Sequence, residues 1–302
     1  MKMAVDVEPH RFYDGGVDAF DDQPEVPPNP GSDAQIELVR ITTADGGEEF
    51  AMMRRIGYRD RHLGELLVPR ATESFRTDLT SVPALFTWLV PKTGRHLPAA
   101  LVHDGLVHPP DDVTYVSTEG HVVLRPEADR VLRDAMADTG TGVVRRWLVW
   151  SAVTAATMLS GEGTGWSPGL ARRYRWTVVG SVLAVVVLGV LASLDLFDVQ
   201  ASWLPSLPWM GDRSWPVELF GGLSGAVVVP LLLGLLWGPF RVAGCVVGVA
   251  LAVLLHVTVA LLGLTMFYQG LERFAAKAPR VAIGVGVVVA GAATGYFVGL
   301  LV

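Results

Sequence analysis

RRYRWTVVGSVLAVVVLGVLASL, residues 172–194, places three arginines directly against an uncharged apolar run. A run of this length is typical of a helix that crosses about 30 Å of hydrocarbon at 1.5 Å per residue. Further apolar runs follow, so we predict helices over 177–197, 219–240, 242–268 and 281–302. The sequence therefore predicts an all-α transmembrane bundle of about four helices in residues 177–302.

Outside this region the composition changes. The chain has 302 residues, 51% of them hydrophobic and 18% charged, and its mean hydropathy is +0.40. These values are too apolar for an ordinary soluble protein and too charged for a pure membrane bundle. Most charged residues precede residue 177, which indicates a soluble domain followed by a membrane domain. The single cysteine, Cys245, excludes a disulfide scaffold, and the net charge of -6 argues against a nucleic-acid partner.

The soluble half divides into three parts. Residues 1–34 are acidic and rich in proline, so we expect a disordered leader. An α+β domain is expected over residues 35–160, and a basic linker over 161–176. The N-terminus has no apolar signal region, and arginines precede the first predicted span. Both features favour a multi-pass protein of the cell inner membrane, with the bilayer as partner and the N-terminal domain in the cytoplasm.

The positive-inside rule fits less well near the C-terminus. Arg273, Lys277 and Arg280 would lie outside the cell if all four runs crossed the membrane. A three-helix topology therefore stays open. Glycines recur every four residues at Gly244 and Gly248, and again over 291–299. Such faces permit close helix packing within the chain, or contact with a membrane-protein partner or a second copy.

Local patterns give the fold class of the soluble domain. Strands are predicted at 36–44, 48–58 and 64–69, the first two joined by the turn signal Asp45-Gly46-Gly47, and a second hairpin at 113–124. Helices are predicted at 83–90, 97–108, 126–140 and 143–159. The last of these is too amphipathic to be a predicted span. A small antiparallel sheet followed by helices is an α+β arrangement.

Three segments combine polar residues with apolar neighbours: TDLTSVP (77–83), AALVHD (99–104) and RPEAD (125–129). His103 and Asp104 lie in an apolar helix, where ionisable side chains need partners. With Asp78 and Asp129 they are candidates for acid–base catalysis. His103, Asp104 and Asp129 are candidate ligands of a divalent metal ion that would activate water.

Structural roles explain the same residues equally well. Asp78 is placed to cap the helix predicted at 83–90 and also to hydrogen-bond His103. Asp129 has Arg125 and Arg133 one turn away on either side, which suits surface ion pairs. Asp104 and His108, four residues apart, form a further ligand pair if 97–108 is helical.

These motifs, together with Leu67-Val68-Pro69 and Ala135-Met136, resemble the DUF1353 family, which is common in bacteria and their phages. The resemblance covers residues 36–160. It implies that Asp78, Ser81, His103, Asp104, Arg125 and Asp129 match recurrent polar positions of the family, and it implies no reaction.

Two functions are compatible with these residues. The first is a binding or structural module, facing the cytoplasm and tethered to the inner membrane. The alternative is a membrane-anchored, metal-dependent hydrolase that uses Asp78, His103, Asp104 and Asp129. The second function would require the metal, and the first would not.

Overall fold

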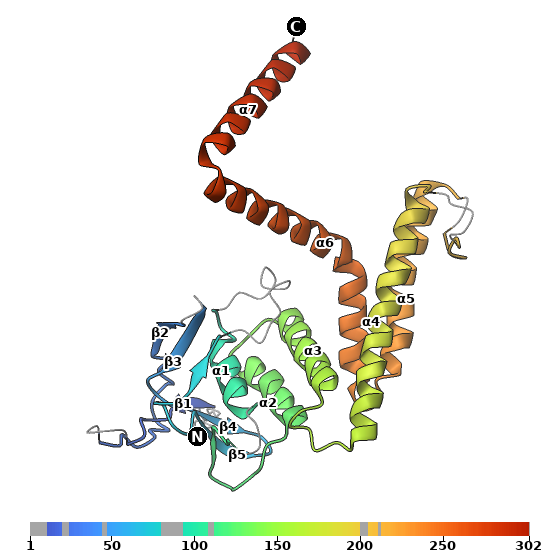
Figure 1. The fold of residues 1–302 in the computed structure, drawn as a ribbon. Coiled ribbons are helices and arrows are strands. Elements are labelled where there is room, and N and C mark those ends of the chain that lie inside the picture. Colours follow the sequence, from blue (N-terminus) through green and yellow to red (C-terminus); the bar gives the residue numbers. More distant parts are fainter. Residues whose placement is uncertain are drawn as a thin grey trace, which may run out of the picture. The chain divides into compact units, whose positions relative to one another are not determined.

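A computed structural model describes residues 11–19, 24–43, 47–79, 93–107, 112–199, 205–210 and 213–301 (Figure 1). The chain divides into two compact units, one ending at Val253 and the other beginning at Leu254. The predicted helix at 83–90 and the turn residues 45–46 lie outside the described residues.

Two antiparallel sheets begin the fold. The first has the order β1-β4-β5-β7, formed by Phe12–Asp14, Ile56–Asp60, Gly64–Val68 and Val116–Ser117. The second has the order β2-β3-β6, formed by Leu38–Thr42, Glu48–Met52 and Arg76–Thr77. The predicted pairing of the strands on either side of residues 45–47 is confirmed, since Leu38 to Thr42 pair antiparallel with Met52 to Glu48.

The β4–β5 hairpin shows why these residues turn. Asp60 Oδ1 accepts hydrogen bonds from the backbone N–H groups of His62 and Leu63, at 2.9 and 3.0 Å. Gly64 then adopts φ of +67°, a left-handed conformation that a side chain would disfavour. The turn places Tyr58 and Leu66 opposite each other, and both are fully buried.

Among the described residues, three helices complete the α+β domain and confirm its class. Helix α1 (Leu97–Leu106) contacts β4 and β5, α2 (Arg125–Asp138) contacts α1, and α3 (Val143–Ser160) contacts α2. Leu101 and Val102 of α1 join Val131 of α2 in one core with the hairpin. Proline in the first turn of α1 and of α2 supplies a φ that suits a helix start.

The expectation of a disordered leader is wrong for its described residues. Phe12–Asp14 form β1 against β4, and Tyr13 is only 1% exposed. Asp14 accepts a hydrogen bond from Arg54 at 2.6 Å. Val17 and Val26 exchange backbone hydrogen bonds. Long-range pairing with β4 thus orders a segment whose composition alone predicted disorder.

Two strand predictions also need correction. The predicted strand 48–58 is broken at Met53–Arg55, so β3 and β4 belong to different sheets. Arg55 Nε instead donates to the Gly15 carbonyl, 3.0 Å away. In 113–124, Val116 and Ser117 pair with Leu67 and Leu66 of β5, and the described residues form no separate hairpin there.

The C-terminal region contains α4 (Pro168–Leu196), α5 (Trp215–Leu235), a short helical turn (Gly238–Phe240), α6 (Arg241–Lys277) and α7 (Pro279–Leu301). Three segments are long and apolar enough to cross a membrane: Pro168–Leu196, Trp215–Leu235 and Gly238–Val257. In α7 the apolar segment that can be assessed in the described residues is Pro279–Ala292. The described structure thus contains three candidate spans, the alternative count that the basic residues near the C-terminus had left open.

The predicted basic linker is mostly helical. Helix α4 begins at Pro168, with Ser167 Oγ accepting from the Leu170 N–H as its N-cap, so only 161–167 connect α3 to α4. Arg172, Arg173 and Arg175 therefore lie in the first two turns of α4. Because an α-helix satisfies its own backbone hydrogen bonds, the span extends without a break from these arginines into the apolar run.

Helix α3 joins the α+β domain to the first candidate span. Val149 and Val153 belong to the domain core, whereas Met158 packs in a second cluster with Val178 of α4 and with Trp237. Trp237 Nε1 donates to Ser181 Oγ at 3.1 Å. The two faces of α3 therefore place the domain directly against α4.

The first glycine face is used within the chain. A Cβ at Gly244 would meet the Trp237 ring at 2.6 Å, and one at Gly248 would meet Pro230 at 2.9 Å. These glycines therefore permit close packing of α6 on α5.

Candidate functional site

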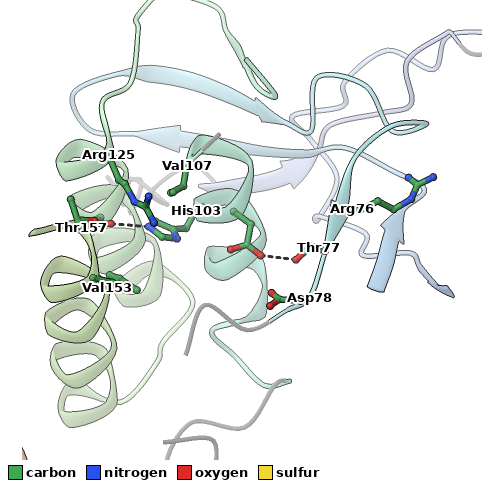
Figure 2. Close-up of a pocket in the computed structure, with 11 residues that line it drawn as sticks. Arg76, Thr77, Asp78, His103, Val107, Arg125, Val153 and Thr157 are labelled. Atoms are coloured by element: carbon green, nitrogen blue, oxygen red, sulfur yellow. Dashed lines mark hydrogen bonds and ion pairs between the residues drawn. The ribbon is translucent and has the colours of Figure 1, made fainter. Parts of the chain in front are cut away.

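A cavity of about 320 Å³ opens between α1, α2, α3 and the end of β6 (Figure 2). Its volume is in the range of small-molecule sites. It is lined by Arg76, Thr77, Asp78, His103, Asp104, Val107, Arg125, Asp129, Val153, Ala156 and Thr157. All the candidate site residues that the structure describes therefore border one cavity. Ser81 and His108 lie outside the described residues.

His103 and Asp129 form the buried pair of this site. His103 Nε2 lies 2.9 Å from Asp129 Oδ1, and the side chains are 5% and 2% exposed. The other carboxylate oxygen of Asp129 accepts from Thr157 Oγ1 at 2.8 Å. Because an ionised carboxylate only accepts hydrogen bonds, this arrangement assigns the shared proton to Nε2. Nδ1 then has a free lone pair, and no hydrogen-bond partner for it occurs among the described residues.

Asp129 is thus not a surface residue. The structural interpretations that paired it with Arg125 or Arg133, and His103 with Asp78, are wrong. Arg133 instead lies 2.9 Å from Asp134. Burial of one face of α2 on α1 and α3 turns the carboxylate inward.

Asp104 faces a different partner. Thr77 Oγ1 donates to Asp104 Oδ2 at 2.6 Å and accepts from the Leu79 N–H at 3.0 Å. Consecutive residues of an α-helix point about 100° apart, so Asp104 and His103 reach different walls of the cavity. Figure 2 shows His103 directed toward Thr157 and away from Thr77, which is the hydrogen-bond partner of Asp104.

The three predicted metal ligands border the same cavity but are not arranged to coordinate one ion. Within the part of the chain that the structure describes, no group of three or more His, Cys, Asp or Glu side chains is arranged to hold a metal ion. His103, Asp104 and Asp129 therefore do not form the expected three-ligand set, because Asp104 is held toward Thr77.

Arg125 forms no ion pair with another described residue of the cavity. Its backbone N–H donates to the Gly163 carbonyl at 2.9 Å, which fixes the start of α2. Its side-chain Nε is buried and lacks a hydrogen-bond partner. In the described residues no carboxylate pairs with this guanidinium. A cation that is always charged therefore borders the cavity without a counter-ion from this part of the chain.

A second polar network fixes α2 on the sheet. Arg130 donates two hydrogen bonds to the carboxylate of Asp60, at 2.9 and 3.1 Å. Burial alone would raise the pKa of Asp60, but Arg130 and the N–H groups of His62 and Leu63 hold it below its usual value. Burial raises the pKa of Tyr58 in β4, and so does the nearby carboxylate of Asp138 at the end of α2.

Sequence reasoning missed three polar lining residues, Arg76, Thr77 and Thr157. Thr77 begins the TDLTSVP motif, but the sequence did not predict a function for it. Thr157 lies one helical turn after Val153, which also lines the cavity. That i, i+4 spacing was the available signal, although the sequence could not show which face of α3 meets Asp129.

Residues 50–153 match the model of a family described as "Protein of unknown function (DUF1353)". No curated protein and no solved structure matches the chain. The match confirms the resemblance and includes Asp78, His103, Asp104, Arg125 and Asp129. It ends before Thr157 and before the three candidate spans.

Proposed function

We propose that this chain, with its DUF1353 segment, is a membrane-tethered binding module whose N-terminal domain faces the cytoplasm and binds a ligand carrying an acidic group. The observation that carries the proposal is the Arg125 guanidinium at the cavity, which has no carboxylate partner among the described residues. Arg125 is half-buried, and its buried Nε lacks a hydrogen-bond partner among the described residues, which is costly; a ligand carboxylate or phosphate would supply that partner. His103 borders the same cavity, where its Nδ1 lone pair can accept a hydrogen bond from a hydroxyl group of the ligand but not from an ionised oxygen.

The distribution of charge supports the cytoplasmic orientation. Arg173 and Arg175 flank Tyr174, whose ring lies 5.5 Å from that of Phe240, next to Arg241. The basic start of α4 and the basic start of α6 are therefore at one end of the bundle. The positive-inside rule places such an end on the cytoplasmic side.

Binding is tested by calorimetric titration of the full chain, reconstituted in phosphatidylcholine nanodiscs, with methyl phosphate and with acetate. We expect saturable binding of at least one of these anions and a loss of about tenfold or more in Arg125→Gln. Arg145→Gln is the matched control, because Arg145 is an exposed arginine of α3 that does not border the cavity. Equal binding by all three proteins would refute the proposal.

Orientation is tested separately with a cysteine at the exposed position Val122 in a Cys245→Ala background. A membrane-impermeant maleimide should label it in inverted vesicles and not in right-side-out vesicles. The reverse pattern would place the domain outside.

A hydrolase is the second candidate, and the Asp129–His103 pair favours it. An imidazole oriented by a carboxylate is suited to act as a general base toward a water molecule in the cavity. Esters, amides and phosphoesters should then be turned over by wild type and not by a folded His103→Gln variant. Turnover that survives this substitution would exclude His103 as the base.

A further inference from the structure

A second cavity adjoins the first. It measures about 450 Å³, and Val107 and Arg125 line both cavities. Leu106, Val113, Val122, Val123 and Leu124 supply most of the remaining wall, together with Tyr115, Glu162 and Gly163. The two cavities therefore meet at Val107 and Arg125, and the second is lined mainly by aliphatic side chains.

The apolar wall is unusually open to solvent. Val122 is 77% exposed and Leu124 is 43% exposed. Aliphatic side chains gathered around an open cavity indicate a binding surface, whereas single exposed ones need no explanation. A ligand with a hydrocarbon portion would remove this surface from water.

The position of the second cavity along the chain also favours a ligand with a hydrocarbon portion. Gly163 lines it, and α4 begins at Pro168. Five residues span at most about 17 Å, so the cavity lies close to the start of the first candidate span. Leu124 also packs near Gly165 of the connecting segment, where an added Cβ would lie 3.3 Å from it. The site is thus within reach of the lipid headgroup layer.

We propose that the ligand is an anionic amphiphile, with its phosphate or carboxylate at Arg125 and its hydrocarbon chain along Leu106, Val113, Val122 and Leu124. This inference rests on the proposed function and adds the apolar half of the ligand. The same chemistry is available from a membrane lipid headgroup and from a soluble acyl or alkyl phosphate.

The test compares methyl phosphate, n-octyl phosphate and n-octanol on the full chain in phosphatidylcholine nanodiscs. Octyl phosphate should bind at least about tenfold more tightly than methyl phosphate, since each buried methylene adds favourable free energy. Octanol should bind more weakly than octyl phosphate because it lacks the charge. Equal affinity of octyl and methyl phosphate would overturn the inference and leave the proposed function standing. Absence of any Arg125-dependent binding would overturn both.

Two variants test separately how the hydrocarbon chain and the acidic group of the ligand contribute to binding. Val122→Asn alters an exposed residue without adding charge, so folding should be retained. It should reduce the gain from the octyl chain, measured as the ratio of the octyl phosphate and methyl phosphate affinities. Arg125→Gln should weaken both phosphates and leave octanol unchanged. A Val122→Asn protein that keeps the full octyl gain would contradict the proposal.

The source of the ligand is distinguished by lipid composition. If the amphiphile comes from the bilayer, phosphatidic acid added to the nanodisc should compete with octyl phosphate. If it comes from solution, the affinity for octyl phosphate should not change. Both results support the amphiphile and identify where it is obtained.

Discussion

His103 Nε2 and Asp129 Oδ1, 26 residues apart in the chain, lie 2.9 Å from each other in a site with almost no solvent exposure. The pair links α1 to the first turn of α2, and Thr157 extends it to α3. Three helices are therefore joined through one carboxylate at the wall of the cavity.

Removal of one member of this pair should destabilise the domain. Asp129→Ala leaves the Nε2–H of His103 buried without its acceptor, and an unsatisfied buried donor typically costs about 1–3 kcal/mol. Amide hydrogen exchange of β4 and β5 in the full chain would measure the loss. Thr157→Val should cost less, because the pair itself remains. A wild-type exchange pattern in Asp129→Ala would contradict the structural role of the pair.

Acid should weaken the attachment of α2 to the sheet. The pKa of Asp60 is lower in the folded protein than its ordinary value, so its contribution is complete above that ordinary value and declines as pH falls through the folded pKa. Asp60→Asn should therefore flatten the loss of thermal stability between neutral and acidic pH. Arg130→Met is the matched variant and should reduce the loss of thermal stability over the same pH range. An unchanged acid transition in both variants would count against this ion pair.

Gly105 should not tolerate a side chain. A Cβ at this position of α1 would lie 2.1 Å from Val68 Cγ1 of β5. Gly105→Ala should destabilise the domain by about 1–3 kcal/mol through overpacking. The double variant Gly105→Ala with Val68→Ala should recover part of the overpacking loss, as measured by hydrogen exchange. A double variant that is only additive would show that this contact is not the cause.

The contact between the domain and α4 depends on Met158. This residue is fully buried against Val178 and Trp237. Met158→Ala should create a cavity at a cost of about 2–5 kcal/mol and loosen α3 from α4. Double electron–electron resonance between spin labels on α3 and α4 should show a broader distance distribution in Met158→Ala than in the wild type. Leu159→Ala, at a 39% exposed neighbour, should leave the distribution narrow.

Several features could be predicted from local sequence. An apolar run beside arginines identifies a membrane span, because charge is excluded from hydrocarbon wherever the rest of the chain lies. Helices α1 and α2 could be located because proline at the start and a periodic apolar face act within a few residues. The polar residues around the cavity were also recognisable, since ionisable side chains in apolar segments need partners.

The partners themselves depended on tertiary structure. Asp78, Asp104 and Asp129 were all candidates for His103, and only the packing of α2 between α1 and α3 selected Asp129. The same packing directed Asp104 to Thr77 and left Arg125 without a carboxylate partner among the described residues. Phe12–Asp14 became a strand only through pairing with β4. The sequence determined where charge and apolar surface occur along the chain, because those are properties of single residues and their near neighbours. Only the tertiary structure decided which charges meet, because side-chain direction is fixed by the packing of elements that are distant in sequence.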